Sequence, residues 1–173
     1  LSRDTTQRDT LVTDSLAIDS TALMPPFPED SVYKMIQAYR HVRMYRSDSQ
    51  MVCDSLVLKN TDSIIRLYIK PILWQEGNQI NSDSMAVYTR DELISKAHFM
   101  GNPIMGMEID TMYYNQVKGK DIVTHFVDGQ MYRNDVEGNA QTIYYMQQED
   151  SPEVTGLMYI ESASITFYFA EGD

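Results

Sequence analysis

The sequence predicts an all-β protein built from stacked, bent strands. Segments such as IVTHF, TIYYM and ITFYF alternate apolar and polar residues, and Val, Ile, Tyr, Phe and Thr are abundant, as is typical of strands. Turn signals recur at Ser47–Ser49, Glu76–Asn78, Asp128–Gly129, Glu137–Asn139, Gln148–Asp150 and Glu171–Gly172. Many short strands with frequent turns favour a sandwich, a barrel or a solenoid-like roll.

Composition and charge narrow the class of protein. With 173 residues, 43% of them hydrophobic and 23% charged, the chain is long enough for one well-buried domain. No run approaches the roughly 18 apolar residues of a membrane-spanning helix. The net charge of −11, from 14 basic and 25 acidic residues, argues against binding to nucleic acid or to an anionic membrane surface. Cys53 is the one cysteine, so neither a disulfide within the chain nor a cysteine-based zinc site is expected.

The first segment, residues 1–30, is expected to be an Asp/Ser/Thr/Pro-rich linker, partly disordered. An Asp recurs every five residues from Asp4 to Asp19, each followed by Thr or Ser, and the stretch MPPFPED adds three prolines. Such residues favour local side-chain-to-backbone hydrogen bonds and interrupt regular ladders. A five-residue solenoid is the alternative, but it would need an apolar residue directly after each Asp. The domain itself is predicted to span residues 31–173.

The start of the domain is ambiguous between helix and strand. Four apolar residues fall at helical spacing after Asp30 or Ser31: Val32, Met35, Ile36 and Tyr39. They predict a short helix, in competition with a strand that begins near Ala38. Four basic residues follow: Arg40, His41, Arg43 and Arg46. Because side chains alternate faces along a strand, we expect this cluster on a solvated edge or face.

One hairpin pattern recurs four times along the rest of the chain. An offset of 37 residues aligns DSMAVYTRDELISKAHFMGN with KDIVTHFVDGQMYRNDVEGN without a gap. Offsets of 29 and 43 residues add the segments that end at Asp62 and Glu171. The identity between copies is low, and what recurs is the order of apolar positions, small residues and an acidic turn.

Within each copy the inward positions change phase. They fall at Val117 and Gly119 and then at Ile122 and Phe126, so an odd series becomes an even one. A strand has a period of two, so the change implies one extra residue at a bulge or corner. The residue before the corner is small in each copy: Cys53, Ser82, Gly119 and Ser162. Each copy is therefore a bent strand, a turn and a returning strand, and stacked copies would fold the sheet over an apolar trough.

Two long segments carry a resemblance to a known family. They are AYRHVRMYRSDSQMVCDSLVLKNTDSIIRLYIKPILWQEGNQINSDSMAVY and YNQVKGKDIVTHFVDGQMYRNDVEGNAQTIYY. About residues 35–173 resemble the OstA-like proteins of Bacteroidetes-type bacteria, relatives of the lipopolysaccharide-transport components LptA and LptC and of the N-terminal domain of LptD. The resemblance implies an open β-jelly-roll with a V-shaped cross-section, located in the periplasm of a Gram-negative bacterium, with association with the outer membrane left open. It also implies a piece of a longer repeat array.

The resemblance further implies a function without catalysis or a cofactor. The trough would hold the acyl chains of lipopolysaccharide or lipid A and pass them toward the outer membrane. Sheet edges would dock other lipopolysaccharide-transport proteins or further copies of the chain, head to tail. The residues predicted to line the trough are Ile80, Met85, Val87, Val117, Ile122, Phe126, Ile160, Ile165, Phe167 and Phe169. The alternative is a closed core whose exposed edge strands recruit another protein of the cell envelope.

No arrangement typical of an active site or a metal site is found. The sequence has no Gly-x-Ser-x-Gly, no phosphate-binding glycine loop and no His-x-x-x-His spacing. His41, His98 and His125 fall in separate strands, and His125, out of phase with its apolar neighbours, is expected to face outward. The acidic residues fall mainly in turns, where they bend and cap the backbone. Cys53 is interpreted as a corner residue, because a reactive thiolate needs nearby cations. An enzyme is therefore the least favoured class.

Overall fold

The computed structural model describes residues 34–45, 49–59, 61–75, 77–91, 93–148 and 151–169. Within these ranges all regular elements are strands, and no helix long enough to cross a membrane is present. The strands form one antiparallel sheet of 12 strands that folds back on itself, so the predicted all-β, open jelly-roll-like class is confirmed. The predicted linker, residues 1–30, lies outside the described residues.

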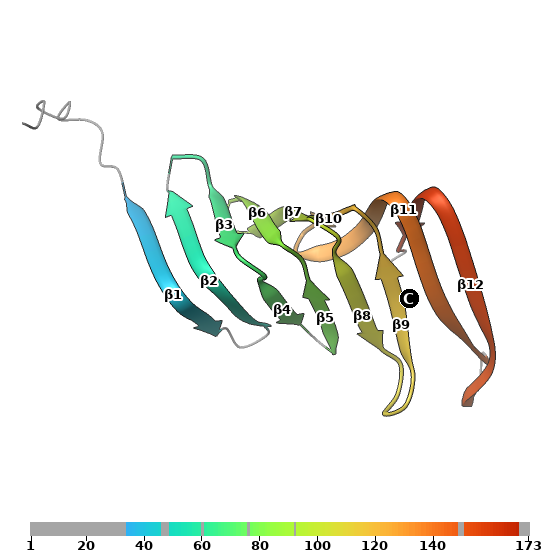
Figure 1. Cartoon of the computed structure of the whole chain (residues 1–173). Helices are drawn as coiled ribbons and strands as arrows, with labels where there is room; N and C mark the ends of the chain where they lie inside the picture. Colours follow the sequence, from blue (N-terminus) through green and yellow to red (C-terminus); the bar gives the residue numbers. More distant parts are fainter. Residues whose placement is uncertain are drawn as a thin grey trace, which may run out of the picture. The chain divides into compact units, whose positions relative to one another are not determined.

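Four long strands run through both halves of the folded sheet: β1 (Met35–Tyr45), β2 (Ser49–Lys59), β11 (Gln130–Gln148) and β12 (Ser151–Tyr168). Between them, the upper leaf consists of β3 (Ile64–Tyr68), β6 (Ser84–Arg90), β7 (Leu93–Met100) and β10 (Asp121–Val127). The lower leaf consists of β4 (Ile72–Gln75), β5 (Asn78–Asn81), β8 (Ile104–Glu108) and β9 (Tyr114–Lys118). Figure 1 shows the two leaves diverging from a common crease, with β1 and β12 at opposite ends.

The predicted corners lie at the crease. On β2, on β5/β6, on β9/β10 and on β12, the core-facing positions step by three residues, as at Gly119 and Ile122. The phase change predicted from the sequence is therefore confirmed. Cys53, Ser82 and Gly119 are buried at the crease, whereas Ser162, on the last strand, is exposed. Small residues occupy these positions because both leaves approach one another there.

The returning strands bend in a different way, which the sequence did not reveal. Their core-facing positions step by four residues and keep phase, as at Val136 and Ala140. Each corner contains two successive residues with positive φ: Arg40-His41, Ile69-Lys70, Gly101-Asn102 and Gly138-Asn139. A corner with a three-residue step thus pairs with a neighbouring corner that has a four-residue step. The extra residue produces bulges in the strand pairing, between Tyr39 and Val42 where β1 pairs with β2 and between Glu137 and Ala140 where β11 pairs with β12.

The interpretation of Glu137–Asn139 as a turn between strands is wrong. Gly138 and Asn139 lie inside the continuous strand β11, where they form its corner. Glycine and asparagine accept a left-handed backbone in turns and in bulges alike, so the pair alone does not distinguish them. By contrast, Asp128-Gly129 forms the predicted turn between β10 and β11.

The predicted helix at the start of the domain is also wrong, since β1 begins at Met35. This strand pairs with β2 along its length and packs Ala38, Val42 and Met44 against the core. Cross-strand hydrogen bonds and this burial override the local helical spacing. Arg40, His41 and Arg43 are exposed on this edge strand, which confirms a solvated edge for the described part of the basic cluster; Arg46 lies outside the described residues.

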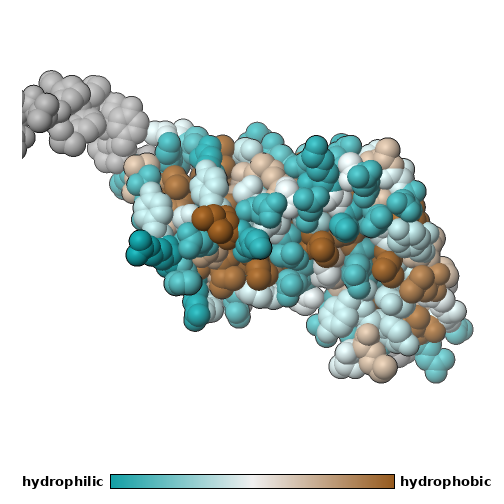
Figure 2. Space-filling view, in the orientation of Figure 1, coloured by the Kyte–Doolittle hydropathy of each residue, from teal (hydrophilic) through white to brown (hydrophobic). Residues whose placement is uncertain are grey.

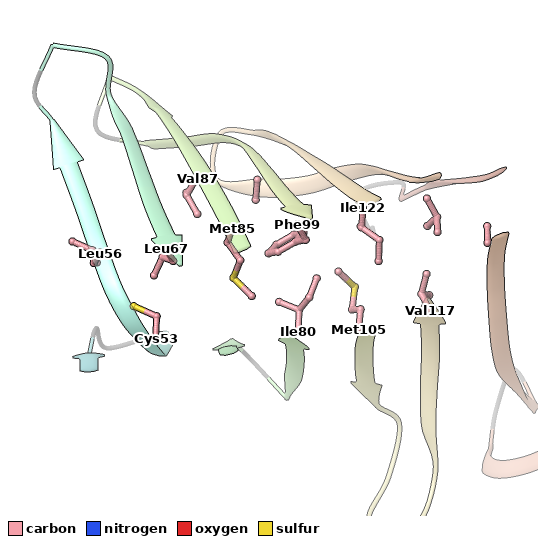
Figure 3. Close-up of a cluster of buried hydrophobic side chains, with 13 residues drawn as sticks. Cys53, Leu56, Leu67, Ile80, Met85, Val87, Phe99, Met105, Val117 and Ile122 are labelled. Carbon is pink, nitrogen blue, oxygen red and sulfur yellow. The ribbon is translucent and has the colours of Figure 1, made fainter. Parts of the chain in front are cut away.

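The core fills the crease between the leaves. Two rows of side chains face one another in Figure 3: Leu67, Met85 and Ile122 belong to the upper leaf, and Ile80, Met105 and Val117 to the lower leaf. Leu67, Met85, Val117 and Ile122 are all less than 2% exposed. Each such side chain contributes about 1.5–3 kcal/mol of hydrophobic stabilisation.

Candidate functional site: an apolar trough

The inner surface of the folded sheet consists of four rows of side chains that continue from strand to strand. The two rows nearest the crease are Ala38–Leu56–Leu67–Met85–Phe99–Ile122–Val136–Ile165 in the upper leaf and Met44–Met51–Leu73–Ile80–Met105–Val117–Thr142–Ile160 in the lower leaf. Farther out lie Ile36–Leu58–Ile65–Val87–Ala97–Thr124–Asn134–Phe167 and, below, Ser49–Gln75–Asn78–Met107–Asn115. We call the last of these the amide row. None of the residues in the four rows is charged.

An open cavity of about 490 Å³ lies between the leaves, outward from the closed crease. Its lining residues are Leu73, Gln75, Asn78, Ile80, Phe99, Met105, Met107, Thr124, Phe126, Gly129, Gln130 and Met131. Its volume is within the range of about 300–1,000 Å³ that small-molecule sites occupy. Figure 2 shows patches of hydrophobic residues across the middle of the molecule, separated by hydrophilic residues. We call the cavity, together with the inner rows that border it, the trough.

The structure separates the predicted trough residues into three groups by depth. Ile80 and Phe126 line the cavity itself. Met85, Val87, Val117 and Ile122 face inward but are 0–4% exposed, because the opposite leaf already covers them. Four residues lie at the β12 end of the sheet: Ile160, Ile165, Phe167 and Phe169. Ile165 and Phe167 pack against the core, and Ile160 and Phe169 are each 37% exposed.

Sequence reasoning found Ile80 but missed the rest of the lower-leaf lining and the polar residues of the trough. Met105 and Met107 belong to a returning strand, and the constant phase from Phe99 through Pro103 would have placed them inward. Gln75 stands next to a predicted turn and Asn78 within it, where polar residues are ordinarily attributed to solvent.

Two polar side chains are buried among the apolar ones on the upper leaf. Thr124 and Asn134 are 2% and 1% exposed, and the Thr124 hydroxyl donates to Asn134 Oδ1 at 2.9 Å. The amide of Asn134 in turn donates to the sulfur of Met105 at 3.8 Å, across the gap between the leaves. These hydrogen bonds compensate for the burial of the two side chains and join the two leaves at this point.

The outer surface holds the ionisable groups. His125 faces outward as predicted, and its Nε2 lies 3.1 Å from Asp135 Oδ2. Asp135 Oδ1 also accepts hydrogen bonds from Arg133 Nε at 2.8 Å and from the Thr166 hydroxyl at 2.9 Å. Desolvation raises the pKa of the Asp135 carboxyl, but these hydrogen bonds and the charge of Arg133 outweigh it. The pKa of Asp135 is therefore lowered. The network joins β10, β11 and β12 on the side away from the trough.

Cys53 is a free cysteine, buried at the crease. Burial, and secondarily the charge of Asp54, raises the pKa of the Cys53 thiol, which opposes formation of a nucleophilic thiolate. Among the described residues, no group of three or more His, Cys, Asp or Glu side chains is arranged to hold a metal ion. Two further hollows, of about 560 and 580 Å³, lie around Gly106 beside Trp74 and around Lys120 at the crease.

The two ends of the sheet are open edges. In the described part of the chain, β1 pairs with β2 alone and β12 pairs with β11 alone. Both carry exposed apolar side chains, among them Ile36 and Tyr39 on β1 and Leu157 and Met158 on β12. Exposed edge strands with apolar side chains are ready surfaces for pairing with another chain.

No family model matches the sequence, and no curated protein matches it significantly.

Proposed function

We propose that the protein is a non-enzymatic module of the bacterial cell envelope that binds the acyl chains of lipopolysaccharide or lipid A in its trough. In this proposal it works in the periplasm and passes lipid toward the outer membrane. The observation that carries the proposal is the cavity of about 490 Å³ between inner faces that bear no charge. The resemblance of residues 35–173 to the OstA-like family supports the choice of lipid.

The lining suits an alkyl chain better than a compact polar ligand. Leu73, Ile80, Phe99, Met105 and Phe126 supply apolar surface at the depth of the cavity. Each CH₂ group removed from water contributes about 0.8 kcal/mol, so a chain of ten such groups contributes about 8 kcal/mol before the entropic cost of binding. Methionine side chains re-pack readily around chains of different length. The cavity therefore favours flexible alkyl chains, with little demand for specific polar contacts.

The open edges support transfer between modules. Because the inner rows reach β12 at Ile160, Ile165 and Phe167, a strand added beside β12 would extend the apolar surface without a break. Docked neighbours, either other lipopolysaccharide-transport proteins or further copies of this chain, would then share one continuous trough. A head-to-tail contact of this kind builds open chains of molecules rather than closed dimers.

Site-specific photo-crosslinking tests the proposal. A photoreactive residue at Phe126, which lines the cavity, is expected to form lipopolysaccharide adducts in Gram-negative cells that secrete the protein into the periplasm. The matched control is Val123, three residues earlier on the same strand, which pairs with the outward-facing His98 and Asp135. Equal labelling from both positions would contradict binding in the trough.

A second candidate is an interaction module that recruits proteins by strand addition and binds no lipid. The closed crease and the apolar edges favour it, because the core needs no ligand to be buried. The mass of the protein in solution, measured over a range of concentrations with and without lipid, separates the candidates. Self-association that lipid leaves unchanged, together with no lipid uptake, would support the interaction module.

A further inference from the structure

The mouth of the trough is lined by side-chain amides. Gln75 and Asn78 are cross-strand partners on the lower leaf, and both line the cavity. Gln130 faces them from the start of β11 on the opposite side of the opening. Deeper in, the lining becomes apolar at Ile80 and Phe99. A ligand whose chain lies in the cavity would therefore place its first polar atoms among amides.

No cation stands in the cavity lining. Of the residues that line it, none is Lys, Arg or His, and the amide row that borders it carries no charge either. The Asp and Glu residues adjacent in sequence to the lining are Glu76, Glu108 and Asp128. His98 and His125 also adjoin lining residues, but their Nε2 atoms lie 3.4 Å and 3.1 Å from Asp121 Oδ1 and Asp135 Oδ2 on the outer face. The chain as a whole has a net charge of −11. An anionic group held at the mouth would lose hydration without gaining a counter-charge, and it would be repelled by the field of the protein.

Amides are well suited to a different kind of head group. An Asn or Gln side chain both donates and accepts hydrogen bonds, so it can pair with hydroxyl, ester and amide groups in either direction. These are the groups that join an acyl chain to a sugar. Carboxylate and phosphate, by contrast, only accept hydrogen bonds when ionised and are bound most strongly by Arg and Lys.

We infer that the trough selects amphiphiles whose alkyl chain is joined to an uncharged, hydroxyl-rich or amide-rich group, as in acylated sugars, and discriminates against those with an anionic group next to the chain. The inference rests on the proposed function, because it assigns the head group of a ligand bound in the same trough. It adds the chemistry that the mouth accepts, which the apolar lining alone does not specify.

Two ligands with the same chain test the inference directly. Dodecyl maltoside and dodecyl phosphate, each below its critical micelle concentration, are titrated against the protein loaded with the uncharged dye Nile red. We expect the maltoside to displace the dye with an affinity about tenfold or more higher than that of the phosphate, because the phosphate brings an unpaired charge to the mouth. Far-UV circular dichroism at each ligand concentration verifies that the protein stays folded.

A charge-matched pair of variants locates the effect. Gln75→Lys places a cation at the mouth and is expected to raise the affinity for dodecyl phosphate about tenfold, with little change for the maltoside. Gln116→Lys adds the same charge on the outer face of the lower leaf, beside Gly106, and is expected to change neither affinity by more than about twofold.

Each outcome separates the inference from the proposed function. If the parent protein binds both ligands with equal affinity, the head-group selectivity is wrong and the trough remains a lipid site. If neither ligand displaces the dye, the lipid-binding function itself is wrong. If Gln116→Lys raises the affinity for dodecyl phosphate as much as Gln75→Lys does, the net charge of the protein determines this affinity and the residues at the mouth do not. That result also overturns the inference.

Discussion

Gly119 shows how closely the two leaves approach one another at the crease. A Cβ atom on this residue would lie 2.7 Å from Val136 Cγ1 and 3.1 Å from the carbonyl oxygen of Glu137. Glycine is therefore required here by lack of space, since its φ is not in the left-handed region. The sequence marked this position as a small corner residue, but it did not reveal which neighbour excludes a larger one.

Substitution at Gly119 should destabilise the fold without touching the cavity. We expect Gly119→Ala to lower the free energy of unfolding by about 1–3 kcal/mol, because Val136 and the backbone of β11 must shift. Gly106→Ala is the matched control, since no atom lies within 4 Å of its added Cβ, and its effect should stay within about 0.5 kcal/mol. Urea unfolding measures both. Equal losses at the two positions would contradict the tight crease.

Asp135 should make the stability of the β11–β12 pairing depend on acid. Its folded-state pKa is lowered from 3.8 by hydrogen bonds with Arg133 and Thr166, so its contribution is present above 3.8 and is lost as the pH falls through the lowered pKa. The difference in unfolding free energy between the parent and Asp135→Asn is therefore expected to be constant near neutral pH and to shrink in strong acid. NMR titration of the Asp135 carboxyl should show a pKa below 3.8 that rises in Thr166→Val. An unchanged pKa in that variant would argue against the network.

At the scale of the strand, the sheet alternates two kinds of corner. The three-residue steps were predictable, because an odd-to-even change in apolar positions is visible in the sequence. The four-residue steps were not, because they preserve the phase and leave the apolar pattern unchanged. Their one signal is the Gly-Asn pair at Gly101 and Gly138, which two other corners lack: Arg40-His41 and Ile69-Lys70 take the same left-handed conformation. The Gly-Asn pairs are predictable because steric clashes exclude most other residues from positive φ. At Arg40-His41 and Ile69-Lys70 the pairing with neighbouring strands imposes this conformation on residues that do not favour it.

Ile69 is the corner residue least suited to its backbone. Its φ is 63°, a conformation that is unfavourable for a β-branched side chain, and the side chain is 63% exposed, so little burial offsets the strain. We expect Ile69→Asn to raise the free energy of unfolding by about 0.5–1 kcal/mol, since asparagine accepts this conformation. Ile104→Asn, at an exposed isoleucine without a positive φ, should be neutral or destabilising. Thermal unfolding of both variants measures the contrast, and destabilisation by Ile69→Asn would contradict the strain.

The start of β1 was not predictable for a related reason. Met35, Ile36 and Tyr39, which suggested a helix, are exposed, whereas the residues that contact the core are Ala38, Val42 and Met44. Local spacing thus grouped Met35 and Tyr39, on the outer face of an edge strand, with Ile36, which lies at the exposed end of an inner row. The inner face of the sheet was predictable from alternation, but the depth of each residue was not. Depth depends on how far the opposite leaf reaches, so Ile122 is part of a packed floor while Phe126 lines a cavity.

At the scale of the whole sheet, the apolar inner rows end at exposed edges. Ile160 closes the lower crease row on β12 and is 37% exposed, although its row partners Val117 and Met105 are buried. The rows are therefore complete in the middle and unfinished at the end. This is the arrangement expected if a neighbouring strand supplies the next member of each row.

A charge at the end of a row should reduce self-association. We expect Ile160→Lys to raise the dissociation constant for head-to-tail contact about tenfold or more, because a lysine would stand where the next apolar member belongs. Tyr159→Lys alters the outer face of the same strand and should have a smaller effect. Sedimentation velocity over a concentration series compares the two variants with the parent. Equal behaviour of all three would show that the inner rows do not continue between molecules.

The alternation of corners limits how such a protein can change length during evolution. A strand whose corner has a three-residue step pairs with a strand whose corner has a four-residue step. Insertion of a single strand would place two corners of the same type side by side, and the inner rows would then lose their register on one side of the inserted strand. Gain or loss of a complete hairpin keeps the alternation intact. Homologues should accordingly differ in whole hairpins, each adding about 10 Å to the groove because neighbouring strands lie about 4.8 Å apart. Duplication of a hairpin-sized stretch of the gene would then lengthen the groove and leave both ends of the sheet unchanged.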